Sequence, residues 1–274
     1  MGSIGRQCIF CDNKADSREH IWSDWILRIL PETTDGKLTR RFEDGSMKTW
    51  STSKPVLTLG KVCEKNCNNG WMNAKLEGPM KAATENIIIR NTSKVFSNAE
   101  LTVISAWAFK TTILANHSSD AAPFFSKEQR YAFARDLTIP KGVHVWLAKR
   151  NAGHLTARHM SLKRVWRKES PIAPHLKQIP ESLNRFELYE CVFSVGYLLL
   201  QVVATRWAKR QVSNRFDAPP IRQGQFFESY AIPIWPNEGN LTVNWPPPNS
   251  VGNFLFEKFC NRFEQFHLPA WMLQ

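Results

Sequence analysis

Three short stretches near the N-terminus decide the fold, and they read Cys8-Ile9-Phe10-Cys11, Glu19-His20 and Cys63-Glu64-Lys65-Asn66-Cys67-Asn68. The four cysteines form two close pairs. Four thiolates are a ligand set that structural zinc prefers, and zinc sites accept both spacings found here. A small unit built from hairpins and one helix needs a stabilising metal ion of this kind, because isolated hairpins are only marginally stable. The sequence therefore predicts a structural zinc ion (Zn2+) held by Cys8, Cys11, Cys63 and Cys67.

An acid, a histidine and an asparagine are interleaved with these cysteines. A neutral imidazole such as that of His20 is suited to take a proton from water near pH 7. The carboxylate of Glu19 and the amide oxygen of Asn68 are hard ligands of the kind that Mg2+ or Mn2+ prefers. Because neighbouring residues on a strand point to opposite faces, we expect Glu19 and His20 to share a site only if the strand bends there.

The order Cys-x2-Cys, acid-His, Cys-x3-Cys-Asn resembles the HNH (ββα-metal) endonucleases, especially the zinc-containing branch related to recombination endonuclease VII. Residues 62–72 together with Leu76-Glu77 also resemble a group of bacterial HNH proteins. The resemblance covers roughly residues 7–80. It implies that His20 is the general base, that Glu19 and Asn68 hold a catalytic Mg2+ or Mn2+, and that the reaction is phosphodiester hydrolysis in DNA, with RNA as an alternative substrate.

Three features depart from the usual pattern of this family. Glu19 stands where the family usually has aspartate. Thr58 stands where the asparagine that orients the histidine is expected, so the orienting role is unassigned. The stretch between His20 and Cys63 is longer than usual and predicts an inserted helix at 23–30 and a hairpin at 37–52.

The helix that follows the second cysteine pair leaves two further assignments open. Asn69 is an alternative to Asn68, because the extra residue between Cys63 and Cys67 makes the register uncertain. Glu77 lies more than two helical turns beyond Asn68 and roughly on the opposite side of the helix, which favours a structural role for it.

Beyond this region, hydrophobic spacing and capping signals predict a mixture of helices and strands. Helices are expected at 68–78, 79–90, 101–116, 127–136 (with Ser126 as N-cap) and 253–266. Strands are expected at 56–62, 143–149 and 155–159, with a long apolar pair between 186 and 207. We therefore expect an α+β protein, with a zinc-stapled ββα nuclease domain at 1–95 and a mixed α+β nucleic-acid-binding or regulatory domain at 96–274.

The chain is strongly basic, with a formal net charge of +12 and a pI near 9.6. Such a charge favours a polyanionic partner, because lysine and arginine displace counterions from phosphates. The candidate contacts to nucleic acid are Arg40, Arg41, Lys48, Lys163, Arg164, Arg167 and Lys168. A solvated face explains each of these groups equally well.

The remaining features bear on location and on rival functions. Cys191 and Cys260 stand apart in apolar surroundings, so no disulfide framework is expected. The longest apolar run, residues 191–204, is shorter than the roughly 20 residues that a spanning helix needs, and we expect a cytoplasmic protein. One rival is a zinc-stabilised nucleic-acid-binding module without catalysis. Another is a nuclease effector regulated by a C-terminal sensing domain. A homodimer would allow one HNH centre to act on each strand.

Overall fold

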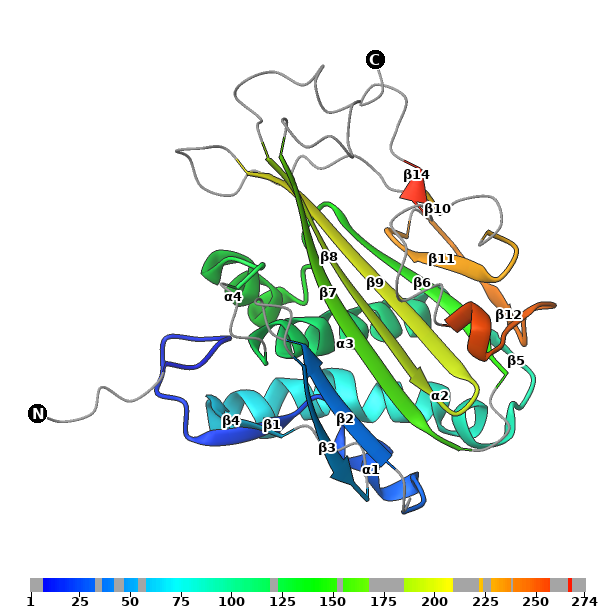
Figure 1. Ribbon diagram of the computed structural model, residues 1–274, viewed down its shortest axis with the longest axis horizontal. Coiled ribbons are helices and arrows are strands. Elements are labelled where there is room, and N and C mark those ends of the chain that lie inside the picture. The colour runs from blue at the N-terminus through cyan, green and yellow to red at the C-terminus, as the bar shows by residue number, and fades with distance from the viewer. Residues whose placement is uncertain are drawn as a thin grey trace, which may run out of the picture.

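The computed structural model describes residues 7–32, 36–41, 47–53, 58–118, 123–151, 155–167, 185–208, 222–223, 228–237, 239–256 and 266–267. Within these ranges most helices lie in the first half of the chain and most strands of the large sheet in the second, and the fold is mixed α+β as the sequence predicts. A small N-terminal strand pair lies beside two long helices, and these helices pack against a large sheet (Figure 1).

The N-terminal unit is built on two antiparallel strands, β1 (Ser17–His20) and β4 (Thr58–Cys63). The chain between them forms helix α1 (Asp24–Ile29) and a hairpin of β2 (Gly36–Arg41) and β3 (Met47–Thr52). These elements confirm the insertion predicted between His20 and Cys63. Helix η1 (Cys67–Glu77) follows shortly after β4, so two antiparallel strands lead into a helix.

The helical region after the second cysteine pair is continuous but kinked. In η1 the backbone of Gly70 leaves the helical region (φ −89°, ψ −105°), a conformation that a residue without a Cβ adopts readily. Helix α2 (Gly78–Arg90) follows directly and carries Pro79 in its first turn, as predicted. It ends at Asn91, whose left-handed conformation (φ 54°) closes the helix.

Helix α3 (Asn98–His117) is the central element of the core. Every residue from 104 to 116 is buried, so this helix is surrounded on all sides by protein. Helix α4 (Lys127–Asp136) begins at Ser126 with the predicted N-cap, whose hydroxyl accepts a hydrogen bond from the amide of Gln129. In the described part of the chain, no helix is both long and apolar enough to cross a membrane.

The large sheet has the strand order β11-β6-β9-β8-β7, with β13 paired in parallel to β6. Its strands are β6 (Val143–Arg150), β7 (Ala157–Arg167), β8 (Arg185–Val195), β9 (Leu198–Ala208), β11 (Ala231–Trp235) and β13 (Ser250–Val251). The long pair β8–β9 confirms the apolar strands predicted between 186 and 207. Strand β7 runs eight residues beyond the predicted end at His159 and includes Lys163, Arg164 and Arg167.

Two short strand pairs complete the fold. Strand β5 (Lys94–Phe96) pairs with β12 (Val243–Trp245), and β10 (Arg222–Gln223) pairs with β14 (Phe266–His267). The helix predicted at 253–266 is described as helical only over 253–256. Phe266 belongs to a strand, so the predicted end of that helix is wrong.

The hydrophobic core continues across residue 95, the predicted domain boundary. Helices α2 and α3 cover one face of the sheet, and a single cluster of buried side chains extends from Cys8 to Trp245 (Figure 1). At the β8–β9 turn, Gly196 (φ 52°) lies so close to Ile88 of α2 that a Cβ would stand 2.0 Å from the Ile88 carbonyl oxygen. The region predicted as a nuclease domain and the sheet therefore share one core, and their division into two domains stays a prediction.

Candidate metal centre and hydrolytic site

Three cysteines gather at the start of the N-terminal unit. The Sγ atoms of Cys8, Cys11 and Cys67 all lie within 4.8 Å of one another. The loop before β1 brings the first two together, because the amide of Cys8 donates to the carbonyl of Asn13 at 2.8 Å. The amides of Phe10 and Glu64 point at the Cys8 sulfur from 3.4 and 3.2 Å. Three clustered thiols with backbone donors around them could bind a metal such as zinc.

Cys63, the fourth predicted zinc ligand, is fully buried beside this group. Its thiol hydrogen-bonds to Cys8, and this bond is the main reason that the pKa of Cys8 falls to about 5, against the opposing effect of burial. The same bond, together with burial, raises the pKa of Cys63. The carboxylate of Glu64 lies 3.5 Å from the Cys11 sulfur and 3.7 Å from the Cys67 sulfur. A fourth donor next to the three-sulfur group is therefore available from either Cys63 or Glu64.

Strand β1 carries the predicted acid and histidine. Glu19 pairs with Leu59 and His20 with Thr58 in the register of β1 and β4. Glu19 is buried and His20 is part-exposed, and the strand register is irregular on both sides of Arg18, just before them. Position 58, where the orienting residue was expected, is therefore directly opposite His20 along the backbone.

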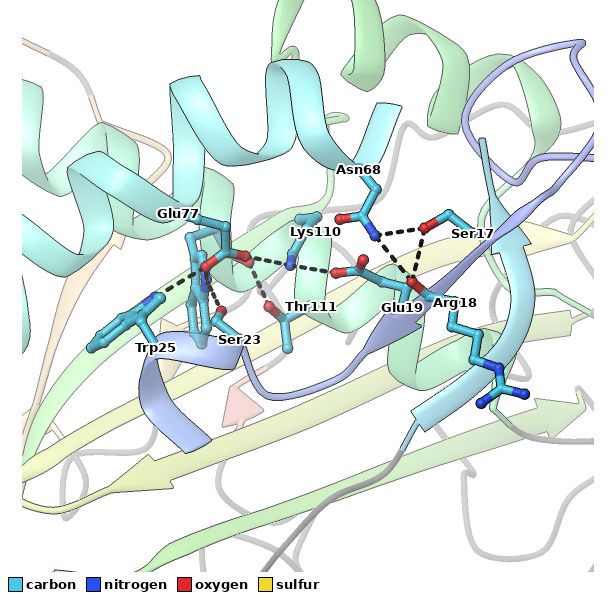
Figure 2. Close-up of polar contacts among 10 residues, drawn as sticks. Ser17, Arg18, Glu19, Ser23, Trp25, Asn68, Glu77, Lys110 and Thr111 are labelled. Carbon is cyan, nitrogen blue, oxygen red and sulfur yellow. Dashed lines mark hydrogen bonds and ion pairs between the residues drawn. The ribbon is translucent and has the colours of Figure 1, made fainter. Parts of the chain in front are cut away.

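Asn68 joins the helix to this strand. Its side-chain nitrogen, Nδ2, donates to the Ser17 hydroxyl and to the Arg18 carbonyl, both at 3.0 Å. Figure 2 shows the amide of Asn68 above β1, close to the carboxylate of Glu19. Because Nδ2 makes both bonds, the amide oxygen is turned away from Ser17. The structure thus links Asn68 to β1 next to Glu19. Between Glu19 and His20 the register is regular, so the bend that would turn both to one face does not occur there.

A lysine from α3 meets the two acids of this region. The ammonium Nζ of Lys110 lies 2.7 Å from Oε1 of Glu77 and 3.4 Å from Oε1 of Glu19. Lys110 has no exposed side-chain surface, and Glu19 has 9%. The other Glu77 oxygen, Oε2, accepts from the indole nitrogens of Trp25 and Trp107, each at 3.1 Å. Glu77 therefore has the structural role that its helical position favours, as the centre of a buried network (Figure 2).

Burial and neighbouring charges determine the ionisation of the three groups. Burial raises the pKa of Glu19, and the Lys110 ammonium offsets only part of this effect. Burial also acts to raise the pKa of Glu77, but Lys110 and hydrogen bonds from Ser23 and Trp107 outweigh it and the pKa is lowered. Burial alone would lower the pKa of Lys110, yet the two carboxylates raise it. Lys110 and Glu77 are thus the tightly paired ions, and Glu19 is the less fully neutralised acid.

Lys110 is the site residue that the sequence reasoning did not find. It lies 91 residues from Glu19 along the chain, within a helix of otherwise mostly apolar or small residues. The available signal was a charged residue in the middle of an apolar helix, since lysine is almost never fully buried unless it is paired. That signal predicts a buried acidic partner without naming it.

The predicted nucleic-acid contacts of the hairpin lie together along the backbone. Arg40 of β2 pairs with Lys48 of β3, and Arg41 follows next to it. Lys48 is exposed, and its ammonium lies 5.4 Å from the centre of the Trp50 ring. The side chains of Arg40 and Arg41 lie outside the described residues, so only Lys48 is located as a side chain.

The second predicted basic group lies at one end of the large sheet. Lys163, Arg164 and Arg167 belong to β7, which is the last strand in the sheet order. Successive residues of a strand alternate between its faces, so positions 163 and 164 fall on opposite faces of β7. Lys163 is half-buried. The side chains of Arg164 and Arg167, and all of Lys168, lie outside the described residues.

Comparison with protein-family models, with curated proteins and with solved structures finds no match. The function is therefore argued from the arrangement of the cysteines, the β1 residues and the buried network.

Proposed function

We propose that the chain is a metal-dependent endonuclease of the HNH type that hydrolyses phosphodiester bonds in DNA. The observation that supports this most strongly is the attachment of Asn68 to β1 through two hydrogen bonds. It joins the helix after the cysteine cluster to the strand that carries Glu19 and His20. A general base, a carboxylate and an amide oxygen then lie within one small unit, as hydrolysis of a phosphodiester requires.

The donor set fits a hard divalent cation. Glu19 and Lys110 make one contact of 3.4 Å, which engages one carboxylate oxygen. In the described part of the chain, no other hydrogen bond to that carboxylate occurs. Glu19 and Asn68 would therefore hold the cation through a carboxylate oxygen and the amide oxygen Oδ1. A bound Mg2+ or Mn2+ would stabilise the negative charge that develops on the phosphate and the leaving oxygen.

The chain's own residues carry the remaining steps. In this proposal an imidazole nitrogen of His20, the part-exposed residue after Glu19 in β1, accepts the proton of the attacking water. The two bonds from Asn68 Nδ2 fix the direction of its Oδ1 relative to β1. The cysteine cluster, with zinc bound, anchors the start of η1 immediately before Asn68. Basic residues including Lys48 and Lys163 would contact the phosphates of the DNA.

Cleavage of supercoiled plasmid by the full chain tests this proposal. The assay compares Mg2+, Mn2+ and EDTA for the wild type and for His20→Ala, with zinc content measured for both. We expect metal-dependent nicking or linearisation that is lost in His20→Ala while zinc is retained. Equal cleavage by the two proteins would reject His20 as the base.

A second function is favoured by one specific contact. The Lys110 ammonium already supplies a positive charge next to Glu19, as a catalytic cation would do. This contact suits a zinc-stabilised nucleic-acid-binding module without catalysis. Binding of DNA in a gel-shift assay by a wild type that cleaves nothing with any divalent cation would favour the binding module.

A further inference from the structure

The buried network around Lys110 has an unbalanced charge. It contains two carboxylates, Glu19 and Glu77, and a single ammonium, so its formal charge is −1 when all three groups are ionised. A net charge in a buried position is strongly unfavourable unless a further cation or hydrogen bonds compensate it. The distribution of this charge between the two acids decides which of them attracts a cation.

Glu77 is the acid that the network satisfies completely. Its Oε1 accepts from Lys110 at 2.7 Å, and its Oε2 accepts from both indole nitrogens at 3.1 Å. The Ser23 hydroxyl also hydrogen-bonds to Glu77, so several neutral donors and one charged donor surround a single carboxylate. This set of donors holds the Glu77 carboxylate ionised and leaves it little capacity to bind anything else.

Glu19 makes the weaker of the two interactions with the Lys110 ammonium. Its contact with Lys110 is 3.4 Å, at the long limit of a hydrogen bond, and involves one oxygen. When both acids are ionised, the excess negative charge therefore resides mainly on Glu19. Figure 2 also shows this acid toward Asn68, on the side of the network away from Trp25.

We propose that Glu77 and Lys110 are positioning residues that set the affinity of Glu19 for a divalent cation. Glu77 holds the Lys110 ammonium away from Glu19. The carboxylate of Glu19 therefore keeps a negative charge that can bind a divalent cation. This inference rests on the proposed function, because it concerns the cation that Glu19 would hold. It makes the site composite: Glu19 and Glu77 come from the N-terminal unit and Lys110 comes from α3, beyond residue 95.

Charge substitutions separate this role from a purely structural one. In Glu77→Gln the amide oxygen can still accept from the indoles, but the ammonium loses its main partner and turns to Glu19. We expect the affinity of Glu19 for Mn2+ to fall about tenfold, because a full positive charge then lies against it. In the double variant Lys110→Met with Glu77→Gln the ammonium is absent, so we expect the affinity to return to the wild-type value or exceed it.

The experiment is a Mn2+ titration of the full zinc-loaded chain followed by electron paramagnetic resonance, which does not detect zinc. Glu19→Gln should abolish the binding. Lys127→Met is the matched control, because it removes a lysine from an exposed ion pair with Asp12 and should leave Mn2+ binding unchanged. Zinc content and the melting temperature of each variant report whether it is folded.

Each outcome decides the inference. Weakened binding in Glu77→Gln that is recovered in the double variant would support it, since damage to the fold would make the double variant worse. Binding that depends on Glu19 but is the same in both Glu77 variants would overturn the inference and leave the proposed function standing. No Mn2+ binding by a wild type that still cleaves plasmid would overturn the inference alone. Neither binding nor cleavage would overturn both.

Discussion

Replacement of Lys110 by methionine should destabilise the protein by about 4 kcal/mol. The ammonium lies 2.7 Å from one carboxylate and 3.4 Å from the other. With an effective dielectric constant of about 20, Coulomb's law gives about 6 and about 5 kcal/mol for these two contacts. Desolvation of the buried ammonium cancels several kcal/mol of this sum, and removal of one member of a buried pair typically costs about 3–5 kcal/mol. The loss is large because Glu77 and Glu19 then face each other without a cation.

Urea denaturation at fixed zinc concentration measures this loss directly. The double variant Lys110→Met with Glu77→Gln should lose less stability than Lys110→Met alone, because it no longer contains the unpaired negative charge of Glu77. Lys127→Met, which breaks an exposed pair, should leave the free energy of unfolding nearly unchanged. A loss below about 1 kcal/mol in Lys110→Met would refute the reasoning, because it would mean that the buried ammonium is not needed to balance the two acids.

Three further predictions concern the metal centre, the packing of the sheet and the response to acid. Cys11→Ala should lower the zinc content and the melting temperature, whereas Cys191→Ala, in the sheet, should retain zinc. Atomic absorption measures the zinc content of both variants. Equal zinc in the two would mean that the cysteine cluster does not bind it. Gly196→Ala should reduce the free energy of unfolding by about 2 kcal/mol or more, because its Cβ would overlap the Ile88 carbonyl at a positive φ. Gly252→Ala, with no atom near the added methyl group, is the control for that change, and equal effects would contradict the packing argument. Burial lowers the pKa of His144 from 6.5 to about 4, so the folded state binds fewer protons than the unfolded state between these values. The stability that His144 contributes is therefore complete above pH 6.5 and lost as the pH falls toward 4, and His144→Phe should retain about 2 kcal/mol more of its pH 7 stability at pH 5 than the wild type does. Parallel pH profiles of the two proteins would reject this assignment.

Elements that depend on local signals could be predicted from the sequence. Helix α4 begins at Ser126 because its hydroxyl and the side chain of Gln129 satisfy free backbone amides at the helix start, a pattern visible within four residues. The hairpin β2–β3 and the strands β8 and β9 follow from short turns between residues of high strand propensity. In each case the interactions that specify the element lie close together in the chain.

Features that depend on distant residues could not be predicted in this way. The pairing of Lys110 with Glu19 joins residues 91 positions apart, and no periodic pattern encodes it. The same limit applies to β14. The apolar spacing predicts Phe266 as the end of a helix, but Phe266 pairs with β10, more than 40 residues earlier. Partners that are remote in sequence override local preference at such positions.

The candidate site was predicted in part. The spacing of the cysteines led to the cluster of Cys8, Cys11 and Cys67, because close pairs in the sequence stay close in space. The link from Asn68 to β1 follows from its place directly after a clustered cysteine. The ammonium next to Glu19 comes from another part of the chain and changes the electrostatics of the site, so the roles of Glu19 and His20 stay predictions.

The most direct test of the proposed hydrolytic site is plasmid nicking by His20→Gly with and without added imidazole, at saturating Mg2+ and with zinc content matched to the wild type. If His20 is the general base, the variant should be inactive and free imidazole should restore part of the activity in proportion to its neutral form. Undiminished nicking by His20→Gly, or a wild type that nicks no DNA with any divalent cation, would contradict the account.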